Sequence, residues 1–209
     1  MVILGLTGSI AMGKSTAAGM FRWLGVPVFD ADGTVHRLLA EGGAGVAPVA
    51  AAFPGTERGT AIDRDAVAAK VFGDASALRR LESVLHPLVR REQTDFLEIH
   101  ARRQAALVVL DIPLLFETRG DRACDRVAVV SAPAFLQLQR MMARPGMTRD
   151  RAAAVLSRQM PDVEKRRRAD FVIPSGLGRA FTFRAIRAIV GKARHASASH
   201  WPPRRQIGK

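Results

Sequence analysis

The feature that most constrains this 209-residue chain is a glycine-rich turn near its start, Gly8-Ser9-Ile10-Ala11-Met12-Gly13-Lys14-Ser15, followed by Thr16. The turn fits the pattern G-x-x-x-x-G-K-[ST] and lies between an apolar stretch and a helical pattern that begins at about Lys14. Glycines permit a backbone path on which successive N–H groups and a helix N-terminus surround a phosphate. The Lys14 side chain is then expected to reach the β- and γ-phosphates, and the Ser15 hydroxyl to bind Mg²⁺. Residues 8–16 therefore predict an ATP-phosphate site.

Short apolar stretches predict five strands, at residues 2–6, 26–29, 106–111, 126–131 and 171–173. They do not alternate with polar residues, and helical patterns separate them, which indicates a parallel sheet covered on both faces. The expected fold is therefore α/β, a three-layer P-loop NTPase sandwich.

The stretch from about Thr34 to Gln104 has an almost entirely helical pattern, with breaks expected at Gly42-Gly43, Pro54-Gly55 and His86-Pro87. It is longer than a simple crossover needs and predicts an inserted helical subdomain. The expected organisation is a core of residues 1–32, 105–136 and 169–192, an insertion at about 33–104, a helical lid at about 137–168, and a disordered basic tail at 193–209.

Several residues predict where helices begin and end. Asp63, Asp74 and Thr148 are expected to cap helices, the last of them reaching about Met160. Pro133 suits the first turn of another helix, and a final helix fits Arg179 to about Lys192.

The chain is strongly basic: 32 Lys and Arg stand against 19 Asp and Glu, for a net charge of +13. This excess indicates polyanionic partners or a compositional bias, and it does not decide between them. A single cysteine, Cys124, excludes an intramolecular disulfide and a cysteine metal cluster. No apolar run reaches the roughly 18 to 20 residues that span a bilayer, and the N-terminus reads as a strand instead of a secretion signal. We expect a cytoplasmic protein, monomeric or weakly homo-oligomeric, without membrane contact.

Two carboxylate positions lie at predicted strand ends. Asp30-Ala31-Asp32 follows the second strand, at the edge where open parallel sheets bind ligands. An acid there can accept the proton of an attacking hydroxyl or hold water on Mg²⁺; alternatively, it caps a helix beginning near Thr34. Asp111 ends the third strand and is either a metal-associated carboxylate or a solvated strand end.

A resemblance to a known family extends these predictions. The segments that carry it follow one another in order from residue 1 to about 190: residues 5–16, 24–32 (Leu-Gly-Val-Pro-Val-Phe-Asp-Ala-Asp), 62–64, 71–72, 85–90 (Leu-His-Pro-Leu-Val-Arg), 110–117 (Leu-Asp-Ile-Pro-Leu-Leu-Phe-Glu), 137–144 and 159–161. This order resembles dephospho-CoA kinases. The resemblance implies ATP- and Mg²⁺-dependent phosphorylation of the ribose 3′-hydroxyl of dephospho-CoA, the last step of coenzyme A biosynthesis.

The resemblance also implies roles for individual residues. Asp32 corresponds to the family's proposed base toward the 3′-hydroxyl. Arg140 and Arg144 lie in the lid, where both would neutralise charge on the transferring phosphoryl group and Arg140 would be a catalytic residue. Without the resemblance, two Arg four residues apart would indicate a solvated helix face. The expected acceptor-binding residues are Asp32, Arg64, His86 and Arg90. A turn for His86 and simple surface charge for the arginines are the alternatives.

The chain departs from the family in two places. Ser9, Ala11 and Met12 stand where Gly, Gly and Ser are usual, and Ala11 would be unfavourable if its position requires positive φ. Near the last strand the family tends to read Asp-Asp-Val-Ile-Asp-Asn-Ser-Gly, whereas residues 170–176 read Asp-Phe-Val-Ile-Pro-Ser-Gly. The lost acids and Asn predict weaker ATP binding or adenine recognition through backbone groups.

Two other functions fit parts of the sequence. One is another small P-loop kinase, acting on a nucleoside monophosphate, shikimate or gluconate; the Asp30–Asp32 segment and the long insertion argue against it. The other is a nucleic-acid-binding NTPase, suggested by the net charge. The absence of Tyr and the wide separation of Trp23 and Trp201 argue against a base-stacking surface, so no nucleic-acid partner is expected.

Overall fold

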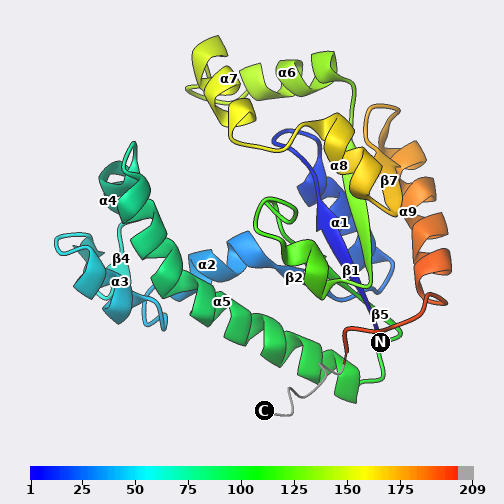
Figure 1. Cartoon of the computed structure of the whole chain (residues 1–209), viewed down its shortest axis with the longest axis horizontal. Helices are drawn as coiled ribbons and strands as arrows, with labels where there is room; N and C mark the ends of the chain where they lie inside the picture. The colour runs from blue at the N-terminus through cyan, green and yellow to red at the C-terminus, as the bar shows by residue number, and fades with distance from the viewer. Residues whose placement is uncertain (202–209) are drawn as a thin grey trace. The chain divides into compact units, whose positions relative to one another are not determined.

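The computed structural model describes residues 1–201 and divides into two compact units. The first combines Met1–Phe29 with the chain from His100 onward, and the second is Asp30–Ile99. The first unit holds a parallel sheet, and the second is the mainly helical part of the chain that comes, in sequence, between two strands of that sheet (Figure 1).

The sheet has five strands in the order β2-β5-β1-β6-β7. They are β1 (Val2–Thr7), β2 (Val28–Asp30), β5 (Leu107–Asp111), β6 (Arg126–Ser131) and β7 (Phe171–Pro174). β1 pairs in parallel with β5, where Leu6 is opposite Asp111, and with β6, where Thr7 is opposite Val129. β6 and β7 are likewise parallel. The predicted α/β fold with a five-stranded parallel sheet is confirmed.

Helices α1 (Lys14–Trp23) and α9 (Arg179–Ala193) pack on one face of this sheet. Leu4 and Leu6 of β1 join Phe21 of α1 and Ile186 of α9 in one buried cluster. Side chains alternate between the two faces of a sheet along a strand, so Gly5 faces the side opposite to α1 and α9. A Cβ on Gly5 would lie 2.8 Å from Cδ2 of Leu115, so a larger residue there would require the Leu115 side chain to shift.

The other helices of this unit come between β5 and β7 in the sequence. They are the 3-10 helix η1 (Gly120–Ala123), α6 (Ala134–Met142), α7 (Arg149–Ser157) and α8 (Asp162–Arg168). The predicted cap at Thr148 is confirmed, since its hydroxyl accepts a hydrogen bond from the Arg151 amide at 3.2 Å. Pro133 immediately precedes α6 as its N-cap residue. The helix predicted to reach Met160 ends at Ser157. Pro161 disfavours helical backbone at Met160 and so excludes Met160 itself from the helix.

The second unit contains α2 (Ala31–Leu39), α3 (Val46–Ala52), α4 (Arg64–Val71), all but the last three residues of α5 (Ala75–Arg102) and a two-stranded hairpin of β3 (Glu57–Arg58) and β4 (Ala61–Ile62). Its core is a cluster that includes Leu39, Val49, Phe53 and Leu85. The almost entirely helical pattern expected here missed the hairpin, whose strands of two residues are too short for a period of two to be recognised.

Two predicted caps in this unit are confirmed, and one predicted break is wrong. The Asp63 carboxylate accepts from the Asp65 and Ala66 amides, and the Asp74 carboxylate from those of Ser76 and Ala77. The predicted break at His86-Pro87 does not occur, because α5 continues through Pro87. Within the described residues, no helix combines the length and the apolar character needed to cross a membrane.

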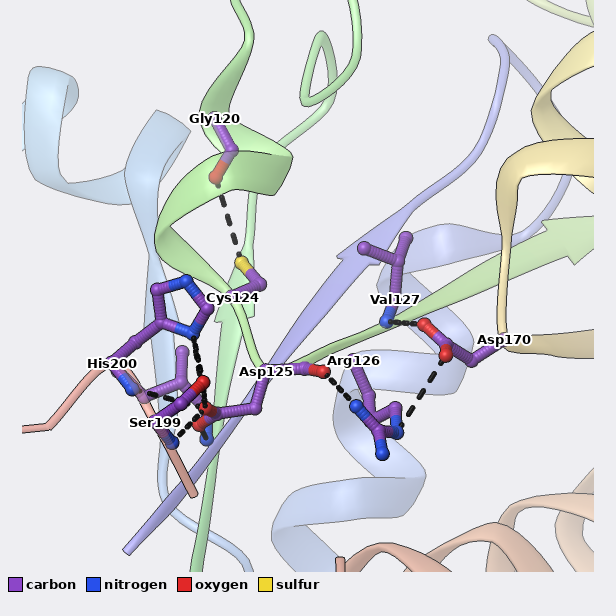
Figure 2. Close-up of polar contacts among 9 residues, drawn as sticks. Gly120, Cys124, Asp125, Arg126, Val127, Asp170, Ser199 and His200 are labelled. Atoms are coloured by element: carbon purple, nitrogen blue, oxygen red, sulfur yellow. Dashed lines mark hydrogen bonds and ion pairs between the residues drawn. The ribbon is translucent and has the colours of Figure 1, made fainter. Parts of the chain in front are cut away.

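The carboxylate of Asp125, directly before β6, accepts hydrogen bonds from residues near both ends of the described chain (Figure 2). Its Oδ2 accepts from the Ile3 amide at 2.8 Å. Its Oδ1 accepts from the backbone and hydroxyl of Ser199 and contacts the His200 amide and Nδ1, at 2.6 to 3.1 Å. These contacts differ from the disorder predicted for the tail; residues 202–209 lie outside the described part.

Replacement of Asp125 is expected to destabilise the first unit. Burial raises the pKa of its carboxyl, but the hydrogen bonds from Ile3, Ser199 and His200 outweigh burial and lower it to about 2 from 3.8. The resulting stabilisation is present above about pH 4 and is lost as the pH falls toward 2. Asp125→Asn should therefore lower the free energy of unfolding at pH 7 by about 2 kcal/mol and flatten its decline in acid. Denaturant unfolding at several pH values measures both effects.

Asp170→Asn is the matched control. Asp170 also accepts from a strand amide, that of Val127 at 2.8 Å, but its side chain is 42% exposed. A loss of stability in Asp170→Asn equal to that in Asp125→Asn would contradict the special role of the buried carboxylate.

Candidate active site

The site lies where the order of the strands reverses. β1 is between β5 and β6 in the sheet, so the chain leaves β1 at the carboxyl edge with Asp111 on one side and Ser131 on the other. Open parallel sheets bind ligands at this position, because the connections from neighbouring strands diverge there and leave a crevice. The predicted phosphate loop leads from the end of β1 into α1.

Backbone geometry explains the glycines of this loop. A Cβ on Gly8 would lie 2.7 Å from the carbonyl oxygen of Val130, so only glycine fits against β6. Gly13, which precedes α1, has φ +90°, a conformation that glycine adopts without steric cost. The first turn of α1 contains no acidic side chain. Its first amides have no partners within the helix, so this end of α1 is suited to an anion.

Side chains from distant segments hold the middle of the loop. The Gln137 amide donates to the Ile10 carbonyl at 2.9 Å, and the Gln159 side-chain oxygen accepts from the Ile10 amide at 3.0 Å. The Arg140 guanidinium lies 3.4 Å from the Ala11 carbonyl, and the Ser175 hydroxyl donates to the carbonyl of Met12 at 2.5 Å. The sequence prediction missed Gln137, Gln159 and Ser175 as site residues. Gln137 and Gln159 lie in segments that carry the family resemblance, but nothing in the sequence indicates that these side chains contact the loop.

Lys14 forms an ion pair with Asp111. Its Nζ lies 2.7 Å from Oδ1 of Asp111, whose side chain is 5% exposed. The alternative of a solvated strand end for Asp111 is therefore wrong, and the acid faces the phosphate loop. Ser15 and Thr16, next along α1, are exposed. The Ser15 hydroxyl and the Asp111 carboxylate are oxygen donors of the kind that Mg²⁺ prefers, so these two residues fit a magnesium ion.

The predicted lid arginines have different surroundings. The Arg140 guanidinium donates to the Ser175 carbonyl at 2.8 Å and to its hydroxyl at 3.2 Å, which holds it beside the loop. Arg144 lies two residues beyond α6 and is exposed. Of the two, the structure brings Arg140 alone into contact with the phosphate loop.

A buried ion pair supports the segment that carries Gln159. Lys165 of α8 is fully buried, and its Nζ lies 2.9 Å from Oε1 of Glu117. The same oxygen accepts from the Met160 amide at 2.9 Å. Burial raises the pKa of Glu117, but the contacts with Lys165 and Met160 prevail and lower it below its usual value. Glu117 is therefore a charged acceptor that holds the backbone next to Gln159.

The acceptor candidates lie in the second unit. Asp30, and not Asp32, caps α2, since its Oδ1 accepts from the Gly33 amide at 2.9 Å. The alternative that an acid of this pair caps the following helix is therefore confirmed for Asp30, and Asp32 is exposed in the first turn of α2. His36 follows one turn later on the same face, and its Nδ1 accepts from Arg64 at 2.7 Å. The sequence prediction missed His36, although its spacing of four residues from Asp32 was a usable signal.

His86 and Arg90 are exposed and one helical turn apart on α5. Their spacing places both on one face of that helix. The expectation of a turn at His86 is wrong, because α5 is continuous there. A role of either residue in acceptor binding stays a prediction.

Comparison with known proteins identifies the family to which this site belongs. The family model described as dephospho-CoA kinase matches residues 2–177. The dephospho-CoA kinase of Paramagnetospirillum magneticum is 66% identical over 79% of this chain and 78% of its own length. That of Rhodospirillum rubrum is 56% identical over 92% of each protein. The chain belongs to the dephospho-CoA kinase family. The predicted family and kinase class are confirmed.

A solved structure agrees with this assignment. A Thermus thermophilus protein, TT1252, has a TM-score of 0.79 and 36% identity over 91% of this chain and 97% of its own. The fold of this dephospho-CoA kinase family member is therefore shared along nearly the whole chain.

The departure predicted at Ala11 has a structural consequence in this dephospho-CoA kinase family member. Ala11 has φ +61°, in the left-handed region that glycine adopts freely. A residue with a Cβ is about 1–2 kcal/mol less favourable in this conformation. The loop therefore contains a strained residue at Ala11.

Replacement of this strained residue should stabilise the protein. Ala11→Gly removes the unfavourable Cβ contact, and part of the gain is offset by the larger entropy of glycine in the unfolded chain. We expect the free energy of unfolding to rise by about 0.5–1 kcal/mol, measured by denaturant unfolding. Gln104→Gly is a matched control, because Gln104 has φ +56° outside the loop and should gain similarly. A less stable Ala11→Gly variant beside a more stable Gln104→Gly variant would contradict this explanation.

Proposed function

We propose that this chain transfers the γ-phosphoryl group of ATP to the ribose 3′-hydroxyl of dephospho-CoA and so forms coenzyme A, the final step of its biosynthesis. The observation that carries the proposal is the loop of residues 8–16, with Lys14 and Asp111 at the carboxyl edge of the sheet, in a chain of this family. In the reaction the 3′-oxygen bonds to the γ-phosphorus, the bond to the β–γ bridging oxygen breaks, and ADP leaves.

Residues of the first unit hold the donor. The loop amides and the N-terminus of α1 bind the phosphates, and Lys14 exchanges its contact with Asp111 for the β- and γ-oxygens. Mg²⁺, held by Ser15 and Asp111, would supply further positive charge toward those oxygens. Arg140 and Arg144 complete the neutralisation when the segment of residues 137–168 closes over ATP and excludes water.

Residues of the second unit bind the acceptor. The Asp32 carboxylate orients the 3′-hydroxyl and takes its proton, and this role needs the exposure that Asp32 has at the start of α2. Arg64, held by His36, binds the acceptor's phosphates with its guanidinium, and Arg90 and His86 contribute from α5. The predicted cytoplasmic location and the monomeric or weakly oligomeric state stay predictions.

One assay tests the function directly. Purified protein with Mg-ATP and dephospho-CoA should yield coenzyme A and ADP in equal amounts, separated by liquid chromatography. Nucleoside monophosphates, shikimate and gluconate serve as competing acceptors. Faster turnover with any of them than with dephospho-CoA would overturn the proposal.

Replacing Asp32 should affect chemistry and spare donor binding. Asp32→Asn removes the proton acceptor and should lower kcat by about 100- to 1,000-fold, while the Kd for ATP stays within about twofold. Asp65→Asn is the control, since Asp65 is another exposed acid in the first turn of a helix of the same unit. Near-normal turnover of Asp32→Asn would remove Asp32 from the role of base.

Replacing Arg64 should affect the acceptor alone. Loss of a charge-assisted hydrogen bond in Arg64→Ala should raise KM for dephospho-CoA by about tenfold or more, with KM for ATP unchanged. Arg79→Ala, at an exposed position of α5 in the same unit, should leave both constants near normal. Equal changes in the two KM values of Arg64→Ala would speak against acceptor binding by Arg64.

A further inference from the structure

We propose that Gln137, Ser175 and Gln159 are positioning residues that shape the phosphate loop for ATP. They would act by fixing its peptide groups from outside and would not themselves touch ATP. The inference rests on the proposed function only in taking the ATP phosphates as the ligand of the loop.

Their effect follows from the geometry of a trans peptide. The carbonyl of one residue and the N–H of the next point in opposite directions, because they share one plane. Gln137 binds the Ile10 carbonyl, and this directs the Ala11 N–H to the opposite side. Ser175 binds the Met12 carbonyl and in the same way directs the Gly13 N–H. Two side chains on the outside of the loop thus aim two amides at its interior, where an anion would bind.

The peptide group that joins Ala11 to Met12 is also fixed by hydrogen bonding. The Met12 amide donates to the Ser9 carbonyl at 3.1 Å, across the turn. The Ile10 amide donates to Gln159 and is thereby directed away from the anion. The pattern assigns Ala11 and Gly13, and not Ile10 or Met12, as the phosphate-binding amides in the middle of the loop.

Each of the three side chains is anchored to the first unit. Gln137 is 7% exposed, so its bond to Ile10 has little competition from water. The Ser175 amide donates to the Ser131 carbonyl at 2.8 Å, which fixes Ser175 at the end of β6. Gln159 precedes Met160, whose amide is held by the Glu117–Lys165 pair. The three residues come from separate segments, so together they restrain the loop from several directions.

Ser175 gives the first test. Ser175→Ala removes the donor to Met12, and Ser175→Thr retains a hydroxyl. Calorimetry should show binding of ATP and of inorganic tripolyphosphate about 3- to 10-fold weaker in Ser175→Ala and recovered in Ser175→Thr. KM for dephospho-CoA should stay within about twofold. Tripolyphosphate isolates the loop from base recognition, and its binding is measurable even if no coenzyme A is formed.

Gln137 gives a second test with a pH signature. In Gln137→Glu an ionised carboxylate cannot donate to Ile10, whereas the protonated acid can. Because position 137 is 7% exposed, burial is expected to raise the pKa of the introduced carboxyl well above its usual value of about 4.3. Relative to wild type at each pH, tripolyphosphate affinity should then be reduced at pH 8 and recover as the pH falls through this raised pKa. Gln137→Met should show the reduction at every pH. Gln139→Glu, an exposed position on the same helix, should match wild type throughout.

The outcomes separate positioning from a purely structural role. Unchanged tripolyphosphate affinity in Ser175→Ala and Gln137→Met would overturn the proposal. So would equal losses for both substrates together with a lower melting temperature, because they indicate general destabilisation. Gln159→Met, which removes the acceptor for Ile10, should weaken tripolyphosphate binding less than Ser175→Ala, since the Ile10 amide is not aimed at the anion.

Discussion

The site depends on the backbone of the turn between β1 and α1, which must present amides and not carbonyls to the crevice. A turn has as many carbonyls as amides, so the carbonyls need partners elsewhere. Here the carbonyls of Ile10 and Met12 accept hydrogen bonds from Gln137 and Ser175. The Gly8 backbone lies so close to Val130 that the turn begins in a fixed place. In the proposed arrangement, these side chains orient the main-chain amides toward an anion without contacting it themselves.

The charge of the site follows from the same geometry. Lys14 opens a helix whose N-terminal end is itself positive, an unfavourable place for an unpaired cation. The buried Asp111 carboxylate compensates for it at 2.7 Å. A buried ion pair gains little net stability, because both groups lose water. In the proposed function, this ion pair keeps the Lys14 ammonium group ordered beside the loop until the ATP phosphates take the place of Asp111.

What the sequence predicted was set by local residues. The loop of residues 8–16, the strands and the caps at Asp63 and Asp74 depend on neighbours a few positions apart, and the structure agrees with them. The partners of the loop were not predictable in this way. Gln137, Gln159 and Ser175 bind loop residues that are 127, 149 and 163 positions away. Such contacts arise only when the sheet places separate segments at one edge.

The wrong prediction of a helix break at Pro87 also has a cause that lies outside the local sequence. Proline inside a helix removes one hydrogen bond and usually costs about 3 kcal/mol, so a break was expected there. Pro87 and Ser83, whose carbonyl loses its partner, are both exposed, and water can satisfy that carbonyl. Leu85 packs in the core of the second unit and favours continuation of α5 on the opposite side of the proline. Burial of one face of α5 therefore outweighs the tendency of Pro87 to break the helix. The exposure of Pro87 and Ser83, which makes this possible, depends on the folded chain and cannot be read from the His-Pro pair.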